Sequence, residues 1–151
     1  MEQILKKLGY KEQERILLIH APEDLKEDLV AAFHTQPAEE ILEDQEFVLF
    51  FARELKEVRT AAERLAASIA PQGRLWIAYP KKSGKKYESD LSRDILWDAF
   101  KDYSFEPVSN FAIDADWSAI RFRPVSEIPS MKRKKAATEE GKSRVRDERK
   151  D

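Results

Sequence analysis

Four lysines lie within six residues of the chain: Lys81, Lys82, Lys85 and Lys86 surround a Ser-Gly pair. Their ammonium groups and the backbone N–H groups around Gly84 have the chemistry to bind a phosphate or a carboxylate. The string S-G-K-K is not a phosphate-binding P-loop, because it lacks the first glycine at the required spacing and a Ser/Thr after the lysine. The alternative is a solvated loop whose lysines balance an acidic body. We predict an anion-binding loop.

Residues elsewhere in the second half of the chain could complete such a site. Trp117 lies at a predicted hairpin turn, where its ring could line a pocket or an interface, with core packing as the alternative. Four aspartates are spaced as loop and cap acids and could form a polar cluster with Arg121 and Arg123 beside the lysine loop, with capping or surface pairing as the alternative. They are Asp90, Asp94, Asp114 and Asp116. The predicted ligand-binding set is Tyr79, Lys81, Lys82, Lys85, Lys86, Asp114, Trp117 and Arg121.

The segment His20-Ala21-Pro22-Glu23 follows the first apolar run, where a nucleotide-binding Rossmann domain would carry glycines. It has no glycine, Pro22 lacks an N–H group, and the acids at the following helix start would repel a phosphate. This composition disfavours standard binding of a dinucleotide or of S-adenosylmethionine. His20 is a candidate general base, and a structural histidine at a strand end is the alternative.

The chain has two histidines and no cysteine. It therefore offers no pattern for a structural zinc site and no thiolate nucleophile. A G-x-S-x-G nucleophile elbow is also absent from the sequence. We predict no metal and no cofactor, and we favour a domain without catalytic activity.

Apolar patterning places these residues on a chain of alternating strands and helices. Residues 15–21, 46–52 and 74–79 are apolar enough for strands that are covered on both faces. Helical spacing of apolar residues follows Pro22 and recurs over 54–70 and 91–103, the last with Ser92 as N-cap. Residues 107–113 and 118–123 are predicted to form an antiparallel pair. Weaker patterns predict a helix over 2–9, a strand over 38–42 and a turn over 71–73.

This order predicts an α/β fold, a Rossmann-like three-layer sandwich. Its sheet is mostly parallel and ends in a C-terminal antiparallel strand pair. We expect one domain over residues 1–126 and a charged, disordered tail over 127–151, because large apolar residues are scarce beyond residue 130. No run approaches the roughly 18 apolar residues of a membrane span, and the first residues do not resemble a signal peptide. Together these features indicate a cytoplasmic protein.

The formal net charge is −2, and the charged residues are unevenly distributed along the chain. Residues 125–151 hold nine Lys/Arg against six Asp/Glu, so residues 1–124 carry a net charge of −5. Duplex DNA is usually bound by a broad basic face. An acidic body with a mildly basic tail disfavours nucleic acid as a partner.

The second half of the chain resembles a family of small bacterial proteins that is defined only as a domain of unknown function. The resemblance rests on W-I-A-Y-P-K-K-S-G-K-K-Y, S-R-D-I-L-W and D-W-S-A-I-R-F-R, and on K-L-G and A-P-E in the first half. The order of elements is similar to a shortened class I methyltransferase fold that lacks the glycine-rich cofactor turn. The resemblance implies that sheet and a cytoplasmic bacterial setting, and it implies no activity.

Two functional hypotheses follow from these observations. The first is a binding or interaction module that recognises an anionic small molecule or a protein partner through the loop after residues 74–79. The alternative is an atypical S-adenosylmethionine-dependent methyltransferase-like enzyme, with His20 or an aspartate as base. Association into a homo-oligomer stays open, and a membrane is not among the expected partners.

Overall fold

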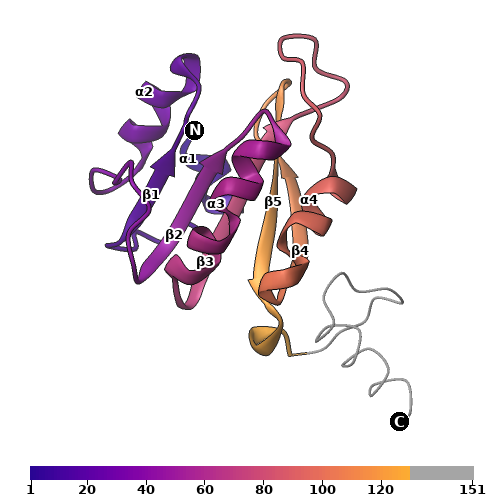
Figure 1. Cartoon of the computed structure of the whole chain (residues 1–151). Helices are drawn as coiled ribbons and strands as arrows, with labels where there is room; N and C mark the ends of the chain where they lie inside the picture. The colour runs from indigo at the N-terminus through magenta and orange to yellow at the C-terminus, as the bar shows by residue number, and fades with distance from the viewer. Residues whose placement is uncertain (130–151) are drawn as a thin grey trace.

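A computed structural model describes residues 1–129, and residues 130–151 lie outside this part of the chain, together with most of the predicted tail. The described part contains a five-stranded sheet in the order β1-β2-β3-β5-β4 (Figure 1). The strands are β1 (Ile16–Ile19), β2 (Gln45–Phe51), β3 (Ile69–Pro80), β4 (Phe105–Ala112) and β5 (Trp117–Pro124). The helices are α1 (Glu2–Lys7), α2 (Glu23–Ala32), α3 (Leu55–Ser68) and α4 (Arg93–Phe100), with short 3₁₀ turns η1 (Lys101–Tyr103) and η2 (Val125–Glu127).

The sheet is parallel in its first half and antiparallel in its second. β1 pairs in parallel with β2, and β2 pairs in parallel with β3. β5 runs antiparallel to both β3 and β4, so the hairpin formed by β4 and β5 folds back onto the sheet. This confirms the predicted mostly parallel sheet with a C-terminal antiparallel pair.

Helices cover the two faces of the sheet and produce three layers. Residues of α1 and α2, such as Leu5 and Leu29, pack into one apolar cluster with Phe47 and Trp76. Residues of α3 and α4, such as Leu65 and Leu96, belong to a second cluster on the opposite face. β1 and β2 read as unbroken apolar runs because both of their faces are buried in this way. Figure 1 shows α3 and α4 in front of the sheet and α1 behind it.

Three expectations about local structure need correction. The predicted strand over residues 38–42 is reduced to a single parallel bridge between Ala38 and Leu17. The predicted turn over 71–73 lies inside β3, which begins at Ile69 and carries an irregularity opposite β2. The helix predicted over 91–103 begins at Arg93, with the Ser92 hydroxyl accepting from the Ile95 N–H as its N-cap, and ends at Phe100 before η1.

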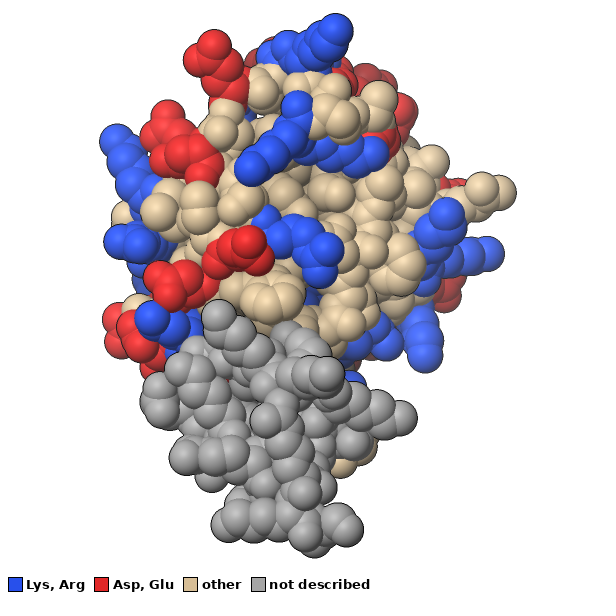
Figure 2. Space-filling view, turned by 90° about the vertical axis from the view of Figure 1, so that its right-hand side faces the viewer, with Lys and Arg blue, Asp and Glu red and all other residues tan. Residues whose placement is uncertain are grey.

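The packed body continues slightly past the predicted domain boundary at residue 126. Ile128 is buried, and a Glu127 carboxylate oxygen accepts a hydrogen bond from the Gln72 N–H. Within residues 1–129, every helix is too short and too polar to cross a membrane. Figure 2 shows acidic and basic side chains interspersed on the face seen from the right-hand side of Figure 1.

Candidate binding pocket

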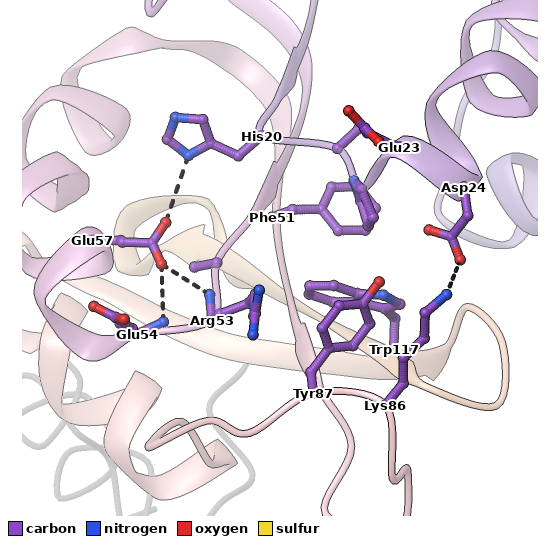
Figure 3. A pocket seen from close by; sticks show the side chains of 13 residues that line it. His20, Glu23, Asp24, Phe51, Arg53, Glu54, Glu57, Lys86, Tyr87 and Trp117 are labelled. Atoms are coloured by element: carbon purple, nitrogen blue, oxygen red, sulfur yellow. Dashed lines mark hydrogen bonds and ion pairs between the residues drawn. The ribbon is translucent and has the colours of Figure 1, made fainter.

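A cavity of about 750 Å³ opens where β1 and β2 end and where α2, α3 and β5 begin (Figure 3). The carboxyl ends of parallel strands are the usual place for a ligand in an α/β sheet, and the volume suits a small molecule. Its lining residues are His20, Ala21, Pro22, Glu23, Asp24, Phe51, Ala52, Arg53, Glu54, Glu57, Lys86, Tyr87 and Trp117.

Three aromatic rings form one side of the pocket. Phe51 ends β2, Trp117 begins β5, and Tyr87 comes from the loop between β3 and α4. The Trp117 ring meets both others, with ring centroids 5.0 Å from Phe51 and 5.0 Å from Tyr87. Phe51 and Trp117 are almost fully buried, whereas Tyr87 is part-exposed. Packing in the sheet therefore fixes two of the rings, and the third lies at the surface.

Acidic side chains outnumber basic ones around the pocket. Glu23, Asp24, Glu54 and Glu57 face two cationic residues, Arg53 and Lys86, which gives the lining a net charge of −2 with His20 neutral. The acids gather here because α2 and α3 both start at the pocket, and helix N-termini favour negative charge. The pocket is consequently a poor environment for an anion.

Glu57 belongs to a capping box that fixes the start of α3. One of its carboxylate oxygens accepts hydrogen bonds from the backbone N–H groups of Arg53, at 3.2 Å, and Glu54, at 3.1 Å. Its other oxygen lies 3.8 Å from Nδ1 of His20. Figure 3 shows Glu57 between these two groups. The capping box thus holds a carboxylate beside the imidazole.

His20 occupies an unusual backbone conformation at the end of β1. Its φ is 57°, in the left-handed region that glycine normally supplies. The turn therefore takes this conformation without a glycine, and strained backbone of this kind often marks a functional position. The His20 side chain is mostly exposed and its ring lies 5.4 Å from that of Phe50.

The loop after β3 reaches back to the pocket through polar contacts. The Ser89 hydroxyl donates to the Arg53 carbonyl at 2.5 Å, and an Asp90 carboxylate oxygen accepts from the Leu55 N–H at 2.8 Å. The guanidinium carbon of Arg53 lies 4.8 Å from the centre of the Tyr87 ring. These contacts place Tyr87 over the aromatic side of the cavity.

Lys86 is the lysine of the loop that lines the pocket, and it is paired with Asp24. Their mutual hydrogen bond lowers the pKa of Asp24 and raises the pKa of Lys86 from their ordinary values. Both side chains are about half exposed. Lys86 therefore neutralises a carboxylate of this protein in the described structure.

The other predicted site residues lie elsewhere. Lys82 and Lys85 are exposed, and Lys81 is part-exposed with its backbone N–H bonded to the Asp116 carbonyl at 2.8 Å. The structure therefore brings His20, Lys86 and Trp117 together and leaves these three lysines outside the pocket. Anion binding by the lysine loop stays a prediction.

Tyr79, Asp114 and Arg121 also lie outside the pocket lining. The Tyr79 hydroxyl accepts from the Asn110 side-chain amide, and Asp114 accepts from the N–H groups of residues 116 and 117 and thereby fixes the hairpin turn. Arg121 is buried four residues along β5 from Trp117. A strand advances about 3.3 Å per residue, so Arg121 lies about 13 Å along β5 from Trp117. The charged groups that act on Arg121 among the described residues are Arg74, Arg123 and Glu127, and the predicted polar cluster with the loop aspartates stays a prediction.

Sequence reasoning missed most of the residues that follow β2. Arg53, Glu54 and Glu57 come directly after a strongly predicted strand, so the rule that ligands meet strand ends would have identified them. Tyr87 carried no such signal, because only the folded loop brings it to the cavity. Among residues 1–129, no group of three or more acids and histidines is placed to hold a metal ion.

No family model and no curated protein sequence matches the chain. Solved structures share its fold. A LepI variant in complex with SAH (S-adenosylhomocysteine) and a substrate analogue aligns with a TM-score of 0.50 and 8% identity, over 81% of this chain and 39% of LepI. Magnesium protoporphyrin IX methyltransferase from Synechocystis with bound SAH aligns with a TM-score of 0.46 and 12% identity, over 67% of this chain and 57% of that one. A protein from Pyrococcus horikoshii aligns with a TM-score of 0.47 and 9% identity, over 81% and 75%.

At these identities the likeness concerns the fold alone. The chain spans 39% of the LepI chain and 57% of the Synechocystis enzyme. It keeps three parallel strands and the antiparallel closing pair, with helices on both faces. The chain has a shortened class I methyltransferase-like fold.

Proposed function

We propose that the pocket binds a small organic cation that carries a flat ring, with S-adenosylmethionine as the leading candidate. The observation that carries this proposal is the combination of three aromatic rings with a net lining charge of −2. Aromatic faces and carboxylates both attract a cation, and the rings also offer a stacking surface. A sulfonium joined to an adenosyl group has both of these features.

The pocket offers a place for each chemical part of that ligand. Tyr87, the part-exposed ring, supplies apolar surface for the adenine ring, with the almost fully buried rings of Phe51 and Trp117 behind it. The acids supply negative potential for the sulfonium. Arg53 is a cation within the lining that could pair with the ligand's carboxylate. The turn over residues 20–23 lacks the usual glycines, and Pro22 lacks an N–H group. Side chains would therefore hold the ligand more than the backbone does.

The choice of an adenosyl ligand rests on pocket chemistry together with the fold. The LepI and Synechocystis structures contain SAH, but a likeness of the fold does not transfer a ligand. Nucleotides suit the pocket less well, because the acids at the starts of α2 and α3 would repel phosphate groups. An anion-binding module finds no support here, since Lys86 is already paired with Asp24.

Methyl transfer is the second candidate function, and the position of His20 favours it. Its imidazole lines the pocket with Nδ1 3.8 Å from the Glu57 carboxylate. A histidine beside a carboxylate is a common arrangement for a general base. His20 could then accept a proton from a methyl acceptor.

Calorimetric titration with S-adenosylmethionine tests the proposed function. Tyr87→Ala removes the surface ring of the pocket, and we expect it to weaken binding about fivefold to thirtyfold, since such ring contacts contribute roughly 1–2 kcal/mol. Tyr103→Ala is the matched control, because Tyr103 is an exposed tyrosine on η1 outside the lining. Equal affinities of the two variants, or no binding by the wild-type chain, would overturn the proposal.

A further inference from the structure

Three arginines gather on the sheet face that carries α1, at a distance from the pocket. Arg121 and Arg123 alternate along β5, so both point to the same face as Trp117 and Ala119. Arg74 lies one residue before the Leu75–Phe122 pair, which places it beside Arg123 on the neighbouring strand β3. We call Arg74, Arg121 and Arg123 the arginine cluster.

The arginine cluster is in part exposed. The Arg74 guanidinium packs against Gly9, which follows α1, so closely that a Cβ atom there would lie 2.4 Å from the Arg74 side chain. Arg74 and Arg123 are part-exposed. Phe111, whose ring lies 5.9 Å from that of Trp76, is 40% exposed. The helices therefore leave this face of the sheet accessible near its edge strand, β4.

Polar atoms of the arginine cluster are buried without hydrogen-bond partners among residues 1–129. Arg121 is only 9% exposed, and its Nε has no partner in this part of the chain. The Nε of Arg123 is also buried and unpartnered, as is Oε1 of Glu127. A buried polar group without a partner costs free energy, so such groups usually receive water or a ligand. Two donors and one acceptor are thus unsatisfied in the same part of the protein.

The electrostatics of the arginine cluster favour an anion. Burial lowers the pKa of Arg121 to about 10, and the charges of Arg74 and Arg123 act in the same direction, whereas Glu127 opposes them. Glu106 is fully buried and lies opposite Arg123 on β4. Within residues 1–129, three guanidinium groups therefore face two carboxylates, which leaves a surplus positive charge around a buried arginine.

We propose that the arginine cluster binds a small oxyanion of the phosphate type. Guanidinium groups are planar donors whose geometry matches two oxygens of a phosphate. A monohydrogen phosphate also carries one hydroxyl, which can donate to the unpartnered oxygen of Glu127. The ligand would satisfy donors and acceptor together and would supply the missing negative charge. The site is independent of the pocket proposed above, which favours a cation at the other end of β5.

Thermal unfolding of the full chain with inorganic phosphate tests the site, against potassium chloride at equal ionic strength. We expect phosphate at about 100 times its dissociation constant to raise the Tm by on the order of 5–10 °C. Arg121→Met should abolish this rise, while its Tm in chloride stays at or above that of the wild type because a buried charge is removed. Arg64→Gln, an exposed arginine on α3, is the matched control and should keep the full rise.

Further arms complete the test. If Arg121→Met does not fold, Arg123→Gln should reduce the phosphate response in its place. Glycerol phosphate distinguishes two kinds of site. It raises the Tm if the site accepts phosphate monoesters, and it leaves the Tm unchanged if the site accepts free phosphate alone. A wild-type Tm that phosphate leaves unchanged relative to chloride would overturn the proposal, and so would a full response in Arg121→Met. S-adenosylmethionine affinity should be equal in Arg121→Met and wild type, which keeps the two proposals separate.

Discussion

Nζ of Lys86 lies 2.5 Å from Oδ2 of Asp24, so the loop after β3 is tied to the first turn of α2 at the edge of the pocket (Figure 3). The two residues are far apart in sequence and meet only because α2 and the loop flank the same strand ends. The pair makes Lys86, which the sequence predicts to bind an anion, part of the pocket wall.

The ionisation of Asp24 is the first prediction. Its pKa is lowered by Lys86, so the pair's stabilisation is present above the ordinary value of 3.8 and is lost as pH falls through the lowered value. The pKa of Lys86 is raised, so the stabilisation that this lysine contributes is present below its ordinary pKa of 10.5 and is lost as pH rises through the raised value. We expect the Asp24 carboxyl to titrate at higher pH in Lys86→Met than in the wild type when followed by carbon NMR. Identical titration curves would show that the two side chains do not pair in solution.

The charge of Glu57 is predicted to attract the ligand, apart from its role in capping α3. Glu57→Gln keeps an acceptor for the capping box, since glutamine also serves there, but removes the negative charge. We expect the affinity for S-adenosylmethionine to fall about threefold to tenfold with little change in Tm. Glu63→Gln, on the exposed side of α3, is the control. An unchanged affinity in Glu57→Gln would mean that the acids do not contribute to binding.

Gly73 is predicted to be essential for the irregular part of β3. A Cβ atom there would lie 2.7 Å from the Gln45 carbonyl oxygen and 2.8 Å from that of Ala70, and both are backbone atoms that cannot move aside cheaply. Gly73→Ala should lower the free energy of unfolding by about 1–3 kcal/mol in urea denaturation. At Gly84 the nearest atom would lie at 3.1 Å, so Gly84→Ala should cost less. Equal stabilities of the two variants would contradict this account of the close contact.

The strong apolar runs made most of the fold predictable. β1, β2 and the core of β3 are uninterrupted because helices cover both of their faces, and the short 113–116 connection is typical of a hairpin such as β4–β5. The failures occurred where local signals compete. Pro71 and Gly73 have the chemistry of a turn, but they fit in β3 because the chain forms a bulge against β2.

The candidate pocket was less predictable than the fold. His20 and Trp117 were singled out because they stand at the ends of predicted elements, and both line the cavity. Lys86 was singled out for its charge, yet its partner Asp24 lies 62 residues away, and no local pattern reveals such a contact. Arg121 lies four residues along β5 from Trp117, and the sequence does not show how far a strand carries a residue from the loop at its start.

A comparison of S-adenosylmethionine with S-adenosylhomocysteine in calorimetric titration tests the central claim most directly. The two compounds share the adenosyl and amino-acid groups, and they differ in one methyl group and the positive charge on sulfur. If carboxylates and aromatic rings bind the cation, S-adenosylmethionine should bind about tenfold or more tightly than S-adenosylhomocysteine. Equal affinities, tighter binding of S-adenosylhomocysteine, or no binding of either compound would contradict the claim that the pocket selects a cationic ligand.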